Sequence, residues 1–286
     1  MTARAGDISV VIPTFDRASV LPRALDSVVR QTRSPAEVIV VDDGSTDDTA
    51  DLVERRFPSV RLLRQVNRGV SAARNRGIEA SESEWIALLD SDDEWWPRKL
   101  ERQMSALKER PELRVCHTDE IWIRHGRRVN QRRIHAKHGG WIFEHCLPRC
   151  AMSPSSIVIH RSVFDEVGMF DEELPACEDY DLWLRICSRY PVLCVDEPLV
   201  VKHGGHEDQL SRQVWGLDRF RIRALEKVID SGHLSEADWQ ASVAMLLEKT
   251  EIYLEGARRR GRLEEAAQYE RRLQHWRCQL HPMEQA

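Results

Sequence analysis

The sequence predicts an α/β fold in which a mostly parallel sheet is sandwiched by helices and followed by a C-terminal helical extension. Two observations support this prediction. Over the first hundred residues, short apolar runs alternate with amphipathic stretches, which is the pattern of a parallel sheet covered by helices. Beyond Asp208 the apolar residues recur only at helical spacing, as in Leu217, Phe220, Ala224 and Val228.

The first elements follow from this pattern in order. Strands are expected in four apolar runs, at 9–13, 38–41, 60–63 and 85–89. Helices are expected between them, where apolar residues are three and four apart, at 20–28, 52–57 and 72–78. Strands that are apolar on both faces need helices on both sides, so a ligand can approach only at the carboxyl ends of the strands.

After about residue 110 the pattern is less regular. The stretch 114–134 predicts a strand and a hairpin, and 154–170 predicts a strand that runs into a short helix. A further helix is expected to begin at Glu178 and Asp179. We therefore expect one α/β domain over 7–208 and a helical extension over 209–286, which could brace the domain or form a homodimer face.

Composition excludes several classes of protein. The 286 residues carry a formal net charge of −5, which argues against a nucleic-acid partner. No apolar run approaches the roughly 20 residues that a membrane helix needs, and the N-terminus has no signal-peptide pattern. The seven cysteines include no Cys-x-x-Cys pair, so we expect reduced thiols. The expected location is the cytoplasm, with peripheral contact to the inner membrane left open.

Carboxylates gather where the second predicted strand ends. Asp42 and Asp43 end an apolar run, and more acids follow within a few residues. We expect Ser45 or Thr46 to cap the next helix, with the later acids in its first turn. Capping does not account for Asp42 and Asp43, so these two are candidate ligand-binding residues.

A second acidic group, "DSDDEWW", follows the fourth predicted strand. Asp90 and Asp92 are two residues apart, so in an extended segment both face one side. Mg²⁺ and Mn²⁺ prefer carboxylate oxygens, and Asp93 adds a third. The alternative is that these acids only begin the helix that follows, where Pro97 suits the first turn.

Three further candidates lie elsewhere in the chain. Arg74, in a predicted helix after a glycine turn, could hold a diphosphate or be a surface charge. Asp179 or Glu178 could accept a proton from a hydroxyl or merely cap a helix. His203, beside a Gly-Gly turn, could bind a metal or phosphate or be an ordinary polar loop residue.

These motifs, in this order, resemble the inverting family 2 glycosyltransferases of the GT-A fold. The resemblance covers roughly residues 7 to 212 and rests on six pieces: "SVVIPTFDR", "VIVVDDGSTDDT", "NRGVSAARNRGI", "WIALLDSDDEWWPRKL", "FDEELPACEDYDLWLR" and "HGGHEDQLSR". It implies a GT-A domain with a Rossmann-like sheet, acting on a nucleotide-sugar donor.

The resemblance also implies a role for each candidate residue. The pocket for the base and ribose would be formed by Pro13, Thr14, Asp42 and Asp43, with Arg74 near the nucleotide. The acidic segment after the fourth strand would bind ribose and a divalent metal, Mn²⁺ or Mg²⁺, through Asp90, Asp92 and Asp93, with His203 as a further metal candidate. The catalytic base would be Asp179, with Glu178 as its partner.

The Gln-x-x-Arg-Trp motif of processive members is absent from the sequence, which indicates transfer of one sugar per encounter. A UDP-sugar is the expected donor. The acceptor would be a glycan or lipid-linked hydroxyl in cell-surface polysaccharide or glycoconjugate synthesis, and the basic stretch 124–149 would shape its side of the pocket. The alternatives are a non-catalytic nucleotide-sugar-binding scaffold, a nucleotidyltransferase and a glycoside hydrolase.

Overall fold

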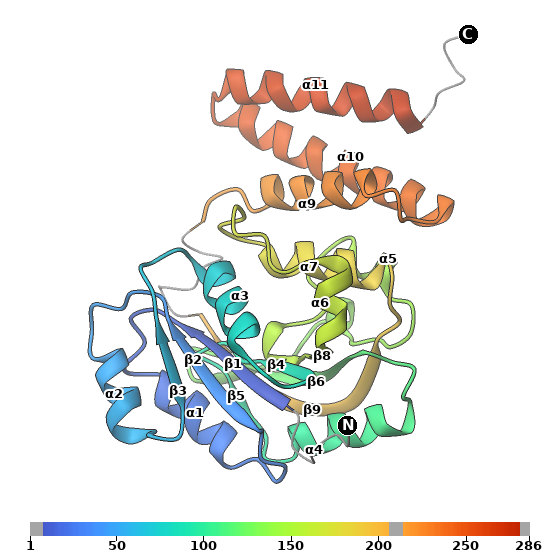
Figure 1. Cartoon of the computed structure of the whole chain (residues 1–286). Coiled ribbons are helices and arrows are strands. Elements are labelled where there is room, and N and C mark those ends of the chain that lie inside the picture. Colours follow the sequence, from blue (N-terminus) through green and yellow to red (C-terminus); the bar gives the residue numbers. More distant parts are fainter. Residues whose placement is uncertain (1–7, 206–213, 281–286) are drawn as a thin grey trace.

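A computed structural model describes residues 8–205 and 214–280 of the chain. Its main feature is a nine-stranded sheet (Figure 1). Eight strands follow the order β3-β2-β1-β4-β8-β6-β9-β5, and the ninth, β7, pairs with β6. The strands are β1 (Ile8–Thr14), β2 (Glu37–Asp42), β3 (Arg61–Arg64), β4 (Trp85–Leu88), β5 (Glu94–Trp95), β6 (Val115–Arg124), β7 (Arg127–Val129), β8 (Val158–His160) and β9 (Leu193–Gly204). All four strands expected in the first hundred residues are present.

The strands that carry the site are parallel. β1 pairs in parallel with β2 on one side and with β4 on the other, and β2 pairs in parallel with β3. Antiparallel β8 joins this half to the parallel pair β6 and β9. Because β1, β2 and β4 run in the same direction, the loops that follow them meet at one edge of the sheet.

Helices cover both faces of the sheet, as Figure 1 shows. Along β1, Val10 and Ile12 face a core shared with α1, α2 and α4, whereas Val11 faces the core on the opposite side. This alternation explains why Val10, Val11 and Ile12 are apolar in succession. The helices of the domain are α1 (Leu21–Val29), α2 (Thr49–Arg56), α3 (Val70–Ala80), α4 (Lys99–Glu109), α5 (Phe143–Cys146), α6 (Arg161–Val167) and α7 (Glu178–Cys187), with 3-10 turns η1 (Arg133–His135) and η2 (Pro154–Ser156).

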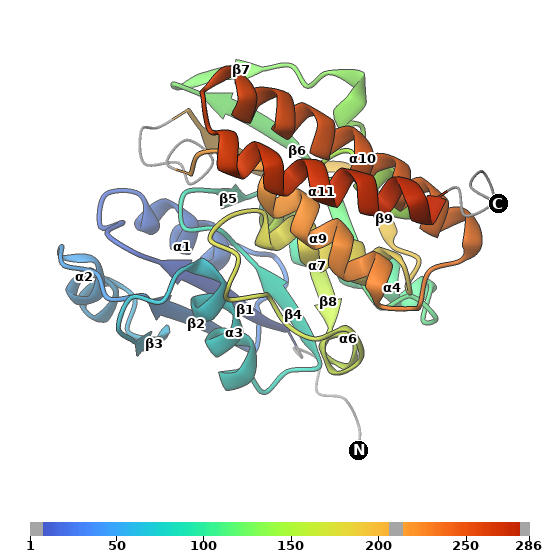
Figure 2. The ribbon, with the colours of Figure 1, turned by 90° about the horizontal axis from the view of Figure 1, so that it is seen from above.

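Three C-terminal helices form a further layer above α7: α9 (Asp218–Asp230), α10 (Glu236–Arg259) and α11 (Leu263–Leu280), which Figures 1 and 2 show from two directions. Their buried residues, such as Leu225 and Leu246, belong to the same hydrophobic cluster as Trp183 of α7. The expected boundary at 208/209 lies outside the described residues. Among the helices of the described residues, none has both the length and the apolar character needed to span a bilayer.

The capping of α2 differs from the expectation. The helix begins at Thr49, and Ser45 and Thr46 instead belong to a loop that is cross-linked to the loop after β1. Asp16 Oδ1 accepts a hydrogen bond from Thr46 N at 2.7 Å, and Ser45 Oγ accepts one from Asp16 N at 2.9 Å. Asp47 Oδ1 accepts from Thr49 N at 2.9 Å. These polar residues hold two loops of the site together, a role that spacing along the chain cannot reveal.

Helix α3 lies unusually close to the sheet because Gly77 faces the strands. A Cβ atom at Gly77 would lie 2.3 Å from Val11 Cγ1 and 3.2 Å from Val41 Cγ2. Both valines are fully buried in strands, so neither side chain can move aside easily. The absence of a side chain at Gly77 therefore sets the distance between α3 and the sheet.

We predict that Gly77→Ala destabilises the protein by about 1–2 kcal/mol, because overpacking outweighs the helix propensity that alanine gains. The measurement is the free energy of unfolding from urea titration. Glu79→Ala, on the exposed face of the same helix, serves as control and should change it by less than about 0.5 kcal/mol. An increase in stability for Gly77→Ala would contradict the close packing.

Candidate active site

A cavity of about 780 Å³ lies at the carboxyl edge of β1, β2 and β4 and reaches the start of α7. The residues predicted from the sequence that line it are Pro13, Thr14, Asp43, Arg74, Asp90, Asp92, Asp93, Glu178, Asp179 and His203. Segments separated by more than a hundred residues in the chain therefore meet in one cavity. The sequence pattern predicted that the strand-end acids share this edge, and the family resemblance implied that Glu178 and Asp179 lie there too.

Asp42 is the predicted residue that does not line the cavity. Its side chain is fully buried, with Oδ1 accepting from Ser45 N at 3.0 Å and Oδ2 lying 3.6 Å from Arg64 Nε. Neighbouring residues at the end of a strand point to opposite sides. Asp42 therefore fixes the loop that follows β2, while Asp43 lines the cavity.

Asp43 organises the turn that begins α3. Its Oδ1 accepts from Gln65 Nε2 at 2.7 Å and from Arg68 N at 2.9 Å, and its Oδ2 accepts from Gly69 N at 2.8 Å. Gly69 has a φ of 91°, a conformation that favours glycine. Beside this turn, the buried Thr14 Oγ1 has no hydrogen-bond partner among the described residues. A ligand in the cavity would supply one.

Arg74 links the sheet edge to α7. Its NH2 donates to Asp90 Oδ1 at 2.7 Å and its NH1 donates to Glu178 Oε1 at 2.6 Å, and only 4% of the side chain is exposed. The guanidinium also lies 5.1 Å from the centre of the Phe170 ring. Its two terminal nitrogens are thus engaged by protein carboxylates, so a nucleotide would meet Arg74 as part of an ion-pair network.

The same network controls protonation at Glu178. Burial raises the pKa of Glu178 and the charge of Arg74 opposes that rise, while neighbouring Asp179 adds to it. Although burial lowers the pKa of Arg74, the charges of Asp90 and Glu178 raise it above its ordinary value. A buried guanidinium between two carboxylates therefore remains charged.

Both side-chain oxygens of Asp93 accept hydrogen bonds from the protein. Its Oδ2 accepts from Ser155 Oγ at 2.6 Å and its Oδ1 accepts from the backbone N of His203 at 2.9 Å. Burial, followed by the charge of Asp92, raises the pKa of Asp93 well above its usual range. Its two oxygens thus already join the acidic loop to η2 and to β9, which makes Asp93 a weaker metal candidate than the sequence suggested.

Asp92 and His203 are better placed to meet a cation. Asp92 is half-buried on the cavity wall, and His203 Nε2 lies 3.5 Å from Glu94 Oε1 on the same wall. In the described residues, no group of three or more His, Cys, Asp or Glu side chains forms a preassembled metal site. One or two carboxylates suit Mg²⁺ or Mn²⁺, which complete their coordination with waters and substrate phosphates. The donor set therefore fits such a cation.

Asp179 lies in the first turn of α7, which provides a second wall of the cavity. Cys177, just before the helix, has a φ of 61°, an uncommon conformation for a residue with a side chain. Asp179 Oδ1 accepts from Tyr180 N at 2.7 Å, and Oδ2 lies 3.0 Å from Cys150 Sγ. The carboxylate is half-buried and is held at both oxygens.

Several residues of the cavity were not predicted from the sequence. Lys202, in β9, lies among carboxylates: burial lowers its pKa, but the charges of Glu120 and Asp93 raise it above the ordinary value. The sequence feature that could have identified Lys202 is its single charge directly after the apolar residues of "LVVKH". Leu217 and Arg221 come from the C-terminal helical part. The basic stretch 124–149, expected to shape the acceptor side, does not line the cavity.

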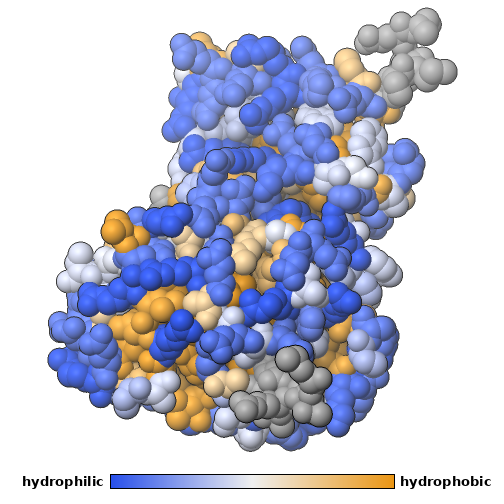
Figure 3. Space-filling view, viewed as in Figure 1, coloured by the Kyte–Doolittle hydropathy of each residue, from blue (hydrophilic) through white to orange (hydrophobic). Residues whose placement is uncertain are grey.

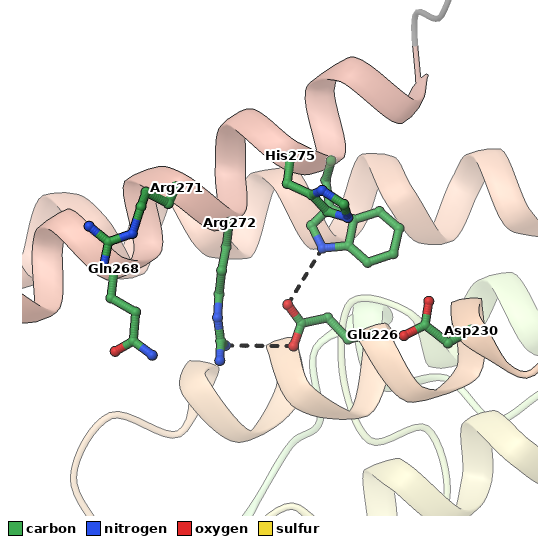
Figure 4. Close-up of a pocket in the computed structure, with 7 residues that line it drawn as sticks. Glu226, Asp230, Gln268, Arg271, Arg272 and His275 are labelled. Atoms are coloured by element: carbon green, nitrogen blue, oxygen red, sulfur yellow. Dashed lines mark hydrogen bonds and ion pairs between the residues drawn. The ribbon is translucent and has the colours of Figure 1, made fainter.

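A second hollow of about 450 Å³ lies between α9 and α11 (Figure 4). Glu226 crosses it, with Oε2 3.6 Å from Arg272 NH1 and Oε1 accepting from Trp276 Nε1 at 3.5 Å. These contacts join the two helices. In the view of Figure 3 the C-terminal helices present mostly hydrophilic residues. The hollow is part of the interface between α9 and α11.

The fold is the GT-A fold of the glycosyltransferases. The family model described as "Glycosyl transferase family 2" matches residues 9–167, more than half of the 286 residues. The chain belongs to this family.

Curated relatives agree with this assignment. An uncharacterized glycosyltransferase of Rickettsia bellii is 27% identical over 271 residues, which covers 87% of this chain and 35% of the relative. The uncharacterized glycosyltransferase YibD of Escherichia coli is 36% identical over 116 residues, which covers 39% of this chain and 34% of the relative. The chain thus spans about a third of the length of these relatives.

Solved structures share the fold. Staphylococcus aureus TarS (1–349) in complex with UDP-GlcNAc superposes with a TM-score of 0.68 at 22% identity, covering 85% of this chain and 71% of that one. A mannosyltransferase of Pyrobaculum calidifontis in complex with GDP-Man and Mn²⁺ gives a TM-score of 0.59 at 17% identity, covering 94% and 84%.

We predict that Arg74→Met destabilises the protein by about 3 kcal/mol or more, because it leaves Glu178 buried without its cation. The measurement is the free energy of unfolding at neutral pH. Arg76→Met, on the same helix but at a more exposed site, is the matched control. Adding Glu178→Gln to Arg74→Met should recover part of the loss, and strictly additive effects of the two substitutions would contradict the ion pair.

Proposed function

We propose that this protein is a non-processive inverting glycosyltransferase that moves one sugar from a nucleotide-sugar donor to an acceptor hydroxyl. The observation that carries the proposal is the single cavity that is lined both by the acids after β2 and β4 and by a carboxylate at the start of α7. A site that only binds a nucleotide does not need a carboxylate on the wall formed by α7. The two walls suit a reaction in which one side holds the departing group and the other receives a proton.

The donor would bind along the sheet edge. Thr14 Oγ1, without a partner among the described residues, and Asp43 would meet the base and ribose beside the Gly69 turn. Asp90, with 23% of its side chain exposed, retains one oxygen for a ribose hydroxyl while Arg74 holds the other. A UDP-sugar is the proposed donor, and the UDP-GlcNAc complex of the structurally similar TarS supports this choice.

Asp179 would act as the general base. It would take the proton of the acceptor hydroxyl as that oxygen attacks the anomeric carbon on the face opposite the diphosphate. A single displacement of this kind inverts the anomeric centre. Glu178 would act indirectly, because it is tied to Arg74 and thereby fixes the start of α7.

Asp92 would hold a divalent cation, with His203 as a further ligand. When bound, Mn²⁺ or Mg²⁺ supplies Lewis-acid stabilisation of the negative charge on the leaving diphosphate. The Mn²⁺ complex of the similar mannosyltransferase supports this proposal.

The acceptor would enter from the side of α9. Leu217 and Arg221 line this part of the cavity together with Cys177. Arg221 NH1 donates to Asp218 Oδ1 at 2.9 Å, and the rest of the guanidinium can face an acceptor. A glycan or a lipid-linked saccharide would meet the protein here, so the C-terminal helices would contribute to acceptor choice.

We predict that Asp179→Asn lowers kcat by about 10²–10⁴-fold, because the substituted side chain cannot take a proton. UDP release from UDP-GlcNAc and other UDP-sugars measures turnover, and calorimetric titration with UDP measures binding. The dissociation constant of UDP should stay within a few-fold of the wild-type value, because Asp179 lies on the other wall. Wild-type turnover in this variant would remove Asp179 from the base role.

We also predict that EDTA abolishes turnover and that added Mn²⁺ or Mg²⁺ restores it. In calorimetry, UDP should bind at least tenfold more weakly without the cation, and Asp92→Asn should show the weak affinity with or without Mn²⁺. Asp93→Asn is the matched comparison: it should lower the melting temperature but keep the response to Mn²⁺. Full turnover in excess EDTA would contradict the metal assignment.

A further inference from the structure

Cys150 contacts the proposed base directly. Its Sγ lies 3.0 Å from Asp179 Oδ2 and 2.9 Å from the carbonyl oxygen of Met152. The residue is half-buried and lines the cavity. A thiol carries a single hydrogen, so it can donate to only one of these two acceptors at a time.

The thiol stays protonated in this environment. Burial, and then the negative charge of Asp179, raise the pKa of Cys150 well above the ordinary thiol value, against the opposing charges of Lys202 and Lys137. A thiolate 3.0 Å from a carboxylate would bring two negative charges together. Cys150 is therefore a hydrogen-bond donor and not a nucleophile.

The two oxygens of Asp179 differ in what holds them. Oδ1 accepts from the backbone N–H of Tyr180 at 2.7 Å, a donor that α7 fixes in place. Oδ2 accepts from a thiol that can rotate about its Cα–Cβ and Cβ–S bonds. Oδ2 is therefore the oxygen whose donor can turn away when a proton arrives.

We propose that Cys150 is a positioning residue for Asp179 that directs the acceptor proton to Oδ2. Before transfer, the S–H group donates to Oδ2 and fixes the carboxylate plane. As the acceptor O–H bond breaks and a new O–H bond forms at Oδ2, the S–H group turns to the carbonyl oxygen of Met152. No bond to sulfur is made or broken, and the acceptor proton ends on Asp179. This inference rests on the proposed base role of Asp179.

The pairing of the two groups can be tested without turnover. The full-length protein is treated with iodoacetamide between pH 7 and 10.5, and peptide mass spectrometry follows alkylation of Cys150 in the wild type and in Asp179→Asn. The pH midpoint for Cys150 should fall by about one unit or more in the variant, because the neighbouring negative charge is gone. The midpoint for the exposed Cys278 should not change. An equal midpoint for Cys150 in both proteins would overturn the contact.

The positioning role is tested by turnover of the preferred UDP-sugar. Cys150→Ala should lower kcat by roughly tenfold, leave KM for the donor and the melting temperature nearly unchanged, and move the acid limb of the pH–rate profile to higher pH. Cys150→Ser, which keeps a rotatable donor, should restore kcat to within about threefold. Cys194→Ala, a half-buried thiol of β9 outside the cavity, is the control.

Unchanged kcat and an unchanged pH profile in Cys150→Ala would overturn the positioning role. Failure of Cys150→Ser to restore activity, with equal melting temperatures, would do the same. If no UDP-sugar is turned over by the wild type, the proposed function fails, while the alkylation experiment still decides whether the thiol and the carboxylate are paired.

Discussion

The site depends on one buried guanidinium. Arg74 binds Asp90 at the end of β4 and Glu178 at the start of α7 with distances of 2.7 and 2.6 Å. One residue further along α3, Asn75 donates to Phe170 O and accepts from Phe170 N, which anchors the loop leading to α7. Removing two like charges from water is costly unless a cation compensates them, so this arrangement forms only when all three elements are in place.

Helix α3 is thus the part that sets the distance between the two walls of the cavity. It can do so because Gly77, three residues after Arg74 and on the same face, lets the helix lie directly on Val11 and Val41. The wall proposed to bind the donor then follows from the parallel strands, and the wall proposed to meet the acceptor follows from α7 and the C-terminal helices that cover it. Arg74 fixes the start of α7 through Glu178, and Cys150 is proposed to position the Asp179 carboxylate within that first turn.

The sequence was sufficient to predict which acids lie at the sheet edge. It was insufficient to predict which side chains point away from that edge and which residues reach the cavity from other elements. Apolar strands followed by acids placed Asp43, Asp90 and Asp92 correctly, because strand direction determines where strand ends lie. The sequence could not show which of Asp42 and Asp43 lines the cavity, because this depends on the exact residue at which β2 ends. The contacts of Arg221 and Cys150 with this site depend on tertiary packing, which leaves no local pattern in the chain.

In the proposed mechanism, Asp179 removes the acceptor proton on the face of the sugar opposite the diphosphate. Time-resolved proton NMR of the first product formed from an α-linked UDP-sugar, with water or a saccharide as acceptor, tests this claim most directly. A single displacement predicts that the β-anomer forms first and that any α-anomer appears only through later mutarotation. An α-configured first product would contradict a single displacement and with it the role assigned to the carboxylate at the start of α7.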